Sequence, residues 1–218
     1  MFNDLKNFKT NFSQAVLICL FFGILLFYPS SVFLNSNKKS ESESYKPVSI
    51  LLRWILKNND HLQNYFAIID KKSAELHVFN PDGVWIASSP VLLGAAIGDY
   101  SAPGIGKRKL SEIRDYEKTT PAGRFITEPG RNLKNEEIIW IDYDAAISLH
   151  RVRVSRPEEK RLQRLASMTP EDNRISYGCI NVPESFYDKH IDPVFGRQQA
   201  VVYILPEAQP IESFFNTR

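Results

Sequence analysis

At 218 residues, the chain has room for one domain of ordinary size plus an appendage. Its 27 lysine and arginine residues nearly balance 25 aspartate and glutamate residues, which leaves a formal net charge of +2. No broad basic face is therefore expected, and this argues against nucleic acid as a partner.

An apolar segment near the N-terminus predicts a membrane anchor. Residues 11–37 hold no charged side chain, and the apolar run from Ala15 to Tyr28, extended through Leu34, approaches the ~20 residues that cross a bilayer. Lys6 and Lys9 precede it, which favours a cytoplasmic N-terminus and export of the remainder. We expect a single-pass anchor in the inner (cytoplasmic) membrane with the domain in the periplasm. The alternative is a signal peptide whose cleavage releases the domain into the periplasm.

A polar linker and a short helix are expected next. Residues 35–49 are too polar to bury surface, which is typical of a tether. From Ile50 to Leu62, apolar residues recur at helical spacing, and Leu51, Trp54, Ile55 and Leu62 lie near one face. We predict an amphipathic helix that packs on the domain. A helix that lies on the membrane surface is the alternative.

Short β-rich runs separated by turn residues make up most of the remaining chain. Asn80-Pro81-Asp82-Gly83 is a strong turn signal and predicts a hairpin between the second and third runs. The pattern favours a mainly β fold, a sandwich or a barrel, with a few short helices. The predicted strands are 65–69, 75–79, 84–87, 91–97, 125–127, 138–141, 147–150 and 200–205.

Two helices are predicted around the end of the strand series. Ser155 and Glu158 fit a capping box for a helix that ends at 169–173 and lies close to any active centre. Pro183-Glu184 opens the second helix. Among the histidines outside these helices, we expect His61 to be solvated and His77 to point away from the core.

The cysteine count isolates one thiol. Cys19 belongs to the apolar segment, so Cys179 is the only cysteine of the exported part. Exported compartments are oxidising, and a lone thiol there forms no internal disulfide. Cys179 is therefore either buried and inert or retained for its chemistry.

The residues around Cys179 suggest a nucleophile and its base. An ordinary thiol has a pKa of ~8.5 and needs a neighbouring base to react at neutral pH. His150, the nearest preceding histidine, is our candidate base. Backbone N–H groups beside Gly178 and Cys179 are candidate donors to an oxyanion. No histidine, cysteine or carboxylate residues have metal-ligand spacing, so we expect neither metal nor cofactor.

Two motifs carry a family resemblance. Ser176-Tyr177-Gly178-Cys179-Ile180-Asn181 resembles the cysteine motif of the L,D-transpeptidases (the YkuD-type catalytic domain), and Thr120-Pro121-Ala122-Gly123-Arg124-Phe125 resembles the turn upstream of it. The resemblance covers about residues 65–205. It implies a mainly β cell-wall enzyme that takes part in cell wall biogenesis and cell shape. The expected organisation is 1–34 anchor, 35–49 linker, 50–64 amphipathic helix, 65–206 catalytic domain and 207–218 tail.

The resemblance implies roles for individual residues. Cys179 matches the nucleophile, which attacks the stem-peptide carbonyl before the terminal D-alanine, and His150 matches the base. Gly178 and the Cys179 amide match the oxyanion hole. The other residues that we predict to bind the oxyanion or the substrate are Ser176, Tyr177, Arg174 and Asn181. For Arg174 and the 107–109 cluster, a role in binding stem-peptide carboxylates and a solvated surface position both stay open.

The chain departs from the family pattern at two positions. Tyr177 stands where the family has a second histidine, which affects the expected substrate or acceptor. Arg151 follows the base where a small hydroxyl residue is common; it is tolerable if its backbone carbonyl orients the histidine. The resemblance implies that the acceptor is an amine of a neighbouring stem or of another wall-linked protein. The alternatives are an L,D-carboxypeptidase or amidase that uses water, and a non-catalytic peptidoglycan-binding module.

Overall fold

The computed structural model describes residues 46–216. The predicted anchor and most of the predicted linker lie outside these residues. Between residues 46 and 216 no helix is long and apolar enough to cross a membrane.

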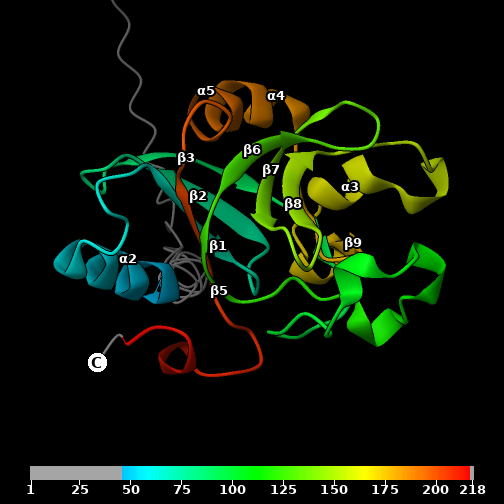
Figure 1. Ribbon diagram of the computed structural model, residues 1–218, viewed down its shortest axis with the longest axis horizontal. Helices are drawn as coiled ribbons and strands as arrows, with labels where there is room; N and C mark the ends of the chain where they lie inside the picture. The colour runs from blue at the N-terminus through cyan, green and yellow to red at the C-terminus, as the bar shows by residue number, and fades with distance from the viewer. Residues whose placement is uncertain (1–45, 217–218) are drawn as a thin grey trace, which may run out of the picture.

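Two sheets and a small pair of strands form the framework (Figure 1). The first sheet contains β3 (Trp85–Pro90), β2 (Glu75–Phe79), β1 (Phe66–Asp70), β11 (Val201–Ile204) and β5 (Gly123–Ile126), in that order. The second contains β10 (Ile180–Val182), β8 (Ile147–Arg151), β7 (Glu137–Asp142) and β6 (Glu128–Arg131). β4 (Leu93–Gly94) pairs with β9 (Arg174–Ser176). The prediction of a mainly β fold with a few short helices is confirmed. Across residues 46–216 neither larger sheet closes on itself, so the barrel alternative is wrong.

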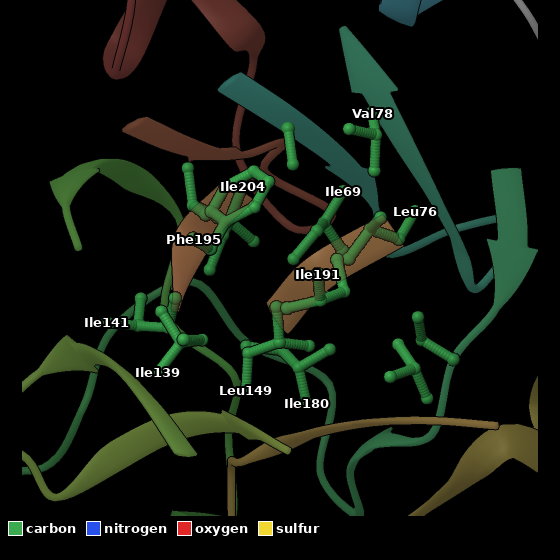
Figure 2. Packing of buried hydrophobic residues seen from close by; sticks show 14 of the residues in the cluster. Ile69, Leu76, Val78, Ile139, Ile141, Leu149, Ile180, Ile191, Phe195 and Ile204 are labelled. Atoms are coloured by element: carbon green, nitrogen blue, oxygen red, sulfur yellow. The ribbon is translucent and has the colours of Figure 1, made fainter. Parts of the chain in front are cut away.

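The main core lies between the two larger sheets. Alternate side chains of β1, Ala67 and Ile69, face this core, and Leu149 and Ile180 meet them from the second sheet (Figure 2). Side chains of a strand alternate between faces, so Phe66 and Ile68 point the other way, into a second cluster. Both faces of the first sheet are therefore buried, which explains why β1 is apolar from Phe66 to Ile69.

The second cluster is covered by α2 (Lys46–Asn58), which buries Val48, Leu51 and Ile55 along one face. The packing prediction for this helix is confirmed, and its boundaries differ from those predicted. The helix begins inside the expected linker, and it ends before Asn59, whose φ of 48° is left-handed. Leu62, predicted on the buried face, lies beyond the helix and is 62% exposed.

Short helices complete the fold. α4 (Glu184–Phe186), the π-helical η6 (Tyr187–Ile191) and α5 (Asp192–Phe195) follow one another over one end of the core, as Figures 1 and 2 show. The predicted insertion before the cysteine motif consists of η4 (Pro157–Glu159), α3 (Arg161–Leu165) and η5 (Pro170–Asn173). The remaining 3-10 turns are η1 (Ile105–Lys107), η2 (Leu110–Glu112), η3 (Asp115–Glu117) and η7 (Ile211–Ser213).

Several local predictions need correction. The hairpin of β2 and β3 is confirmed, whereas of 91–97 only β4 is a strand. Ser155 caps nothing, because Arg156 is the N-cap of η4 and makes no side-chain cap bond. His61 is buried and donates from Nε2 to Pro81 O at 2.8 Å. His77 does point away from the main core, which Leu76 and Val78 enter, but it is buried on the opposite face of β2, and this burial lowers its pKa.

Candidate active site

Strand alternation gathers the predicted site on the outer face of the second sheet. On β8, Ile147 and Leu149 enter the core, so Ser148 and His150 point outward. On β10, Ile180 and Val182 enter the core, so Asn181 points outward. The parallel register of these strands pairs Asn181 with His150, and Cys179 immediately precedes β10. The chain thus brings Cys179 and His150 together as predicted.

The Cys179 thiol is partly exposed and surrounded by polar groups. Its Sγ lies 3.6 Å from Ser148 Oγ and 3.6 Å from the carbonyl oxygen of Ala146. Burial raises the pKa of this thiol, but the hydrogen bond and charge of His150, with hydrogen bonds from Ser148, outweigh it. The pKa of Cys179 is therefore lower than that of an ordinary thiol. Such a thiol forms its thiolate more readily, as a nucleophile requires.

The tautomer of His150 follows from its partners. Nδ1 lies 2.7 Å from the backbone carbonyl of Arg151, which only accepts, so Nδ1 carries the proton. Nε2 keeps its lone pair and is the nitrogen that can take a proton. The backbone of Arg151 thus orients the base. The guanidinium of Arg151 contacts Asp188 at 2.6 Å and lies 4.2 Å over the Tyr187 ring. It therefore points away from His150, and an arginine at this position leaves the base undisturbed.

Asn181 connects the base to the helical insertion. Arg161 Nη1 donates to Asn181 Oδ1 at 2.6 Å, which fixes the orientation of the amide. Asn181 Nδ2 then lies 3.4 Å from His150 Nε2 and 3.3 Å from the carbonyl oxygen of Cys179. The predicted position of the insertion beside the active centre is confirmed by this contact.

Ser176 and Gly178 shape the turn that presents the thiol. Ser176 Oγ donates to Cys179 O at 2.6 Å and accepts the Gly178 N–H at 3.0 Å. Gly178 has a φ of 129°, a conformation that is almost confined to glycine. The Gly178 N–H, predicted as an oxyanion donor, is thus already bonded within the turn. Of the two predicted donors, this leaves the Cys179 N–H for the oxyanion.

The site opens into a cavity of about 430 Å³. Tyr177 is one of its walls, and Lys118 Nζ lies 4.5 Å over the Tyr177 ring. Sequence reasoning missed three cationic residues that line the cavity, Lys134, Arg153 and Arg161. Arg161 could have been predicted, because it belongs to the helical insertion that the sequence analysis placed close to the active centre.

The predicted substrate-binding cations lie elsewhere. Arg174 is held by Glu207 and donates from Nη2 to Lys71 O at 2.8 Å, so its guanidinium has no place in the cavity. Arg108 pairs with Glu117 at 3.0 Å. Among the described residues, no group of three or more histidine, cysteine or carboxylate side chains is arranged to hold a metal ion.

Comparisons with known proteins give matches among solved structures alone. No family model and no curated protein matches the sequence. The helical cell shape determining protein Pgp2 from Campylobacter jejuni is 15% identical with a TM-score of 0.43, over 67% of this chain and 49% of that chain. L,D-transpeptidase 1 of Mycobacterium tuberculosis is 12% identical with a TM-score of 0.36, over 65% of this chain and 60% of that chain. The catalytic domain of an E. faecium L,D-transpeptidase is 18% identical with a TM-score of 0.36, over 66% of this chain and 99% of that chain.

This chain spans about half the length of the Pgp2 chain. The similar structures include L,D-transpeptidases, the family that the two motifs indicated.

Proposed function

We propose that this protein is an L,D-transpeptidase-like cysteine acyltransferase that acts on peptidoglycan stem peptides. The observation that supports it most is the thiol of Cys179 beside His150, whose tautomer the Arg151 carbonyl fixes. This arrangement matches what an activated cysteine nucleophile needs: a base within reach and a group that orients the base. The motifs around Cys179 and Thr120 supply the substrate class.

In the first half-reaction, His150 Nε2 takes the thiol proton and Cys179 Sγ attacks the carbonyl before the terminal D-alanine. A C–S bond forms, and the carbonyl oxygen becomes an oxyanion that the Cys179 N–H binds. The intermediate then collapses with cleavage of the C–N bond. The leaving amine of D-alanine takes the proton back from His150, and a thioester remains on Cys179.

In the second half-reaction, an amine of a neighbouring stem or of a wall-linked protein attacks the thioester. His150 removes the proton of the attacking amine, the C–S bond breaks, and the thiol is regenerated. With water in place of the amine, the same steps give hydrolysis. The open cavity beside Cys179 is the space into which donor and acceptor enter.

The charges around the cavity suit an anionic substrate. Lys134, Arg153 and Arg161 line it with one carboxylate, Glu136. Arg153 pairs with Glu136 at 3.0 Å, and Arg161 pairs with Glu159 at 2.5 Å. Lys134 is therefore the lining cation that no ion pair within residues 46–216 holds. Stem peptides carry free carboxylates, which accept charge-assisted hydrogen bonds from an ammonium group, and Lys134 replaces Arg174 in the role that sequence reasoning gave it.

The proposed location follows the apolar N-terminal segment. We place the domain in the periplasm, tethered by a single-pass anchor in the cytoplasmic membrane. A reporter fused after Lys39 is expected to be active only in the periplasm, and activity confined to the cytoplasm would contradict this orientation.

The test of the activity uses the full chain in detergent with a disaccharide-tetrapeptide, and products are followed by mass spectrometry. A cross-linked dimer with released D-alanine indicates transfer, and tripeptide alone indicates hydrolysis. Cys179→Ala and His150→Ala should each remove the products. Products that persist in Cys179→Ala, or no product with the wild type, would contradict the proposal.

A further inference from the structure

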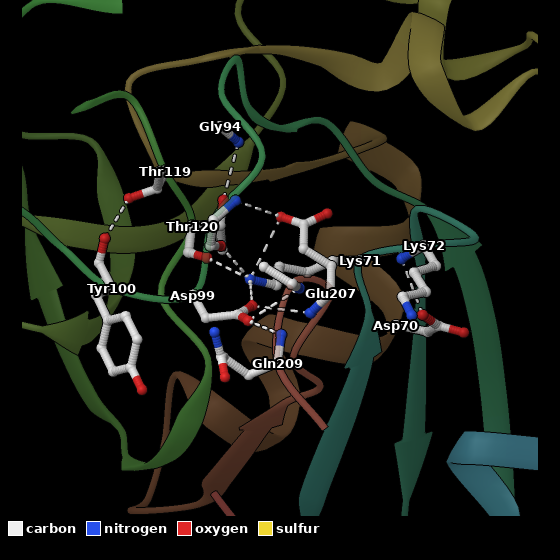
Figure 3. Close-up of polar contacts among 12 residues, drawn as sticks. Asp70, Lys71, Lys72, Gly94, Asp99, Tyr100, Thr119, Thr120, Glu207 and Gln209 are labelled. Atoms are coloured by element: carbon white, nitrogen blue, oxygen red, sulfur yellow. Dashed lines mark hydrogen bonds and ion pairs between the residues drawn. The ribbon is translucent and has the colours of Figure 1, made fainter. Parts of the chain in front are cut away.

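A buried ionic cluster around Lys71 and Asp99 has no part in the reaction steps (Figure 3). The ammonium of Lys71 is fully buried and lies 2.8 Å from Asp99 Oδ1. It also donates to Gly98 O at 2.6 Å and to Thr120 O at 2.8 Å. Asp99 in turn accepts three backbone N–H groups, those of residues 207, 208 and 209. A charge cluster this deep is costly unless every group is paired, and here the pairs hold several distant segments together.

Thr120 links this cluster to the cysteine turn. Its side chain is fully buried, and its Oγ1 lies 2.8 Å from Gly178 O and 2.8 Å from the backbone nitrogen of Gly94. The Gly94 N–H can only donate, so Oγ1 accepts it. The single hydroxyl proton of Thr120 then points to Gly178 O, and the direction of both bonds is fixed.

The bonded carbonyl belongs to the same peptide unit as the Cys179 N–H. No peptide bond in residues 46–216 is cis, and in a trans peptide the C=O and the N–H point in opposite directions. By holding Gly178 O on the buried side, Thr120 turns the Cys179 N–H toward the side that carries the thiol. A hydrogen bond to the carbonyl also polarises the unit and strengthens its N–H as a donor.

The same peptide unit is closely enclosed. A Cβ added at Gly178 would lie 2.6 Å from Thr119 O and 2.6 Å from Ile147 Cδ1. The turn thus has little room to rotate, and the hydroxyl of Thr120 sets the direction of the one predicted oxyanion donor that the turn leaves unbonded.

We infer that Thr120 is a positioning residue for the oxyanion, with the Lys71 cluster as the support that holds the Thr120 backbone. The inference deepens the proposed acyl transfer and rests on it for the natural substrate. It makes a specific claim of its own: loss of the Thr120 hydroxyl impairs attack on a carbonyl and spares other reactions of the same thiol.

Two reagents separate these effects in the full chain carrying Cys19→Ala, which leaves Cys179 as its one thiol. With p-nitrophenyl acetate, Cys179 Sγ forms a thioester, passes through an oxyanion and releases p-nitrophenolate. With iodoacetamide, Sγ forms a thioether and releases iodide, and no oxyanion arises. The ratio of the two labelling rates therefore reports the oxyanion donor alone.

Thr120→Val is expected to slow acylation by about tenfold or more while the iodoacetamide rate stays unchanged, since loss of one oxyanion donor costs ~10²–10³ and misdirection somewhat less. Thr120→Ser keeps the hydroxyl and should restore acylation. Equal slowing of both reactions, no slowing in either, or a Thr120→Ser rate as low as that of Thr120→Val would overturn the inference.

A measurement on the wild type covers the case in which Thr120→Val does not fold. A hydroxyl proton held by Gly178 O exchanges slowly and gives a resolved NMR resonance for Thr120; rapid exchange would overturn the inference. If p-nitrophenyl acetate acylates Cys179 in a Thr120-dependent way but stem peptides are not turned over, the proposed substrate fails and the inference stands. A Cys179 that neither reagent labels contradicts both.

Discussion

Two polar clusters meet at the Gly178–Cys179 peptide, and they differ in how closely their working groups are bonded. On the open side, the two reacting atoms have long contacts: His150 Nε2 lies 3.4 Å from Asn181 Nδ2, and Cys179 Sγ lies 3.6 Å from Ser148 Oγ. On the buried side, the bonds of Lys71 and Thr120 measure 2.6–2.8 Å. Groups that exchange protons must change partners during a turnover, whereas groups that position a donor must not. The contrast separates chemistry on one side of the peptide from support on the other.

The largest effect is expected from removing the base on the open side. His150→Ala should slow acylation of Cys179 by ~10²–10⁴, the usual contribution of a general base. The pKa of the Cys179 thiol should also rise, because His150 is the main group that lowers it. The wild-type thiolate forms at a lower pH, so the midpoint of a pH profile of iodoacetamide labelling should move upward in the variant.

The matched control for this experiment is His190→Ala, which lies outside the cavity and should leave rate and midpoint unchanged. A midpoint that is the same in His150→Ala and the wild type would show that His150 does not interact with the thiol.

The next effect comes from breaking the buried side. Lys71→Met leaves Asp99 buried without its cation, and loss of one partner of a buried pair costs about 3–5 kcal/mol of unfolding free energy. Urea denaturation measures it. The neighbouring Lys72 is exposed, so Lys72→Met should change stability by less than about 0.5 kcal/mol. Equal unfolding free energies for the two variants would show that the Lys71 cluster does not stabilise the fold.

A smaller effect should come from the turn itself. Gly178→Ala should lower the unfolding free energy by about 3 kcal/mol, since a side chain there is strained and meets Thr119 O. Gly104 also has a positive φ, 68°, and has no atom within 4 Å of an added Cβ. Gly104→Ala should therefore cost only about 1 kcal/mol. Similar losses in both variants would mean that the turn is not closely enclosed.

The smallest effect is expected from the link between the insertion and the base. Arg161→Gln weakens the hold on Asn181, so the rate of D-alanine release should fall by about tenfold, the equivalent of one lost hydrogen bond. Arg156→Gln, on an exposed side chain of the same insertion, is the control. Identical rates for both variants would leave Asn181 without a positioning partner.

Local sequence patterns were enough to predict much of the fold and the centre of the site. The Asn80–Gly83 turn predicted its hairpin, and apolar runs predicted the longer strands. β6 was missed because Glu128-Pro129-Gly130-Arg131 has neither apolar alternation nor β-prone residues. β9 and β10 were missed because three residues are too short for a periodic signal. The juxtaposition of Cys179 and His150 followed from the motifs.

The partners of charged residues could not be predicted in this way. Lys71 lies between Asp70 and Lys72 in a polar turn, a context typical of surface residues, yet it is buried against Asp99. Arg174 pairs with Glu207, which lies 33 residues away along the chain. No local pattern encodes such pairings, because they depend on which segments the tertiary fold brings together.

The most direct test of the central claim is a search for the acyl-enzyme. The full chain is incubated with a tetrapeptide stem, quenched with acid and mapped by mass spectrometry of its peptides. We predict an added tripeptide acyl group on Cys179 and on no other residue, with one D-alanine released for each group bound. Release of D-alanine without an adduct, at the same rate in Cys179→Ala, would contradict the claim that Cys179 is the nucleophile.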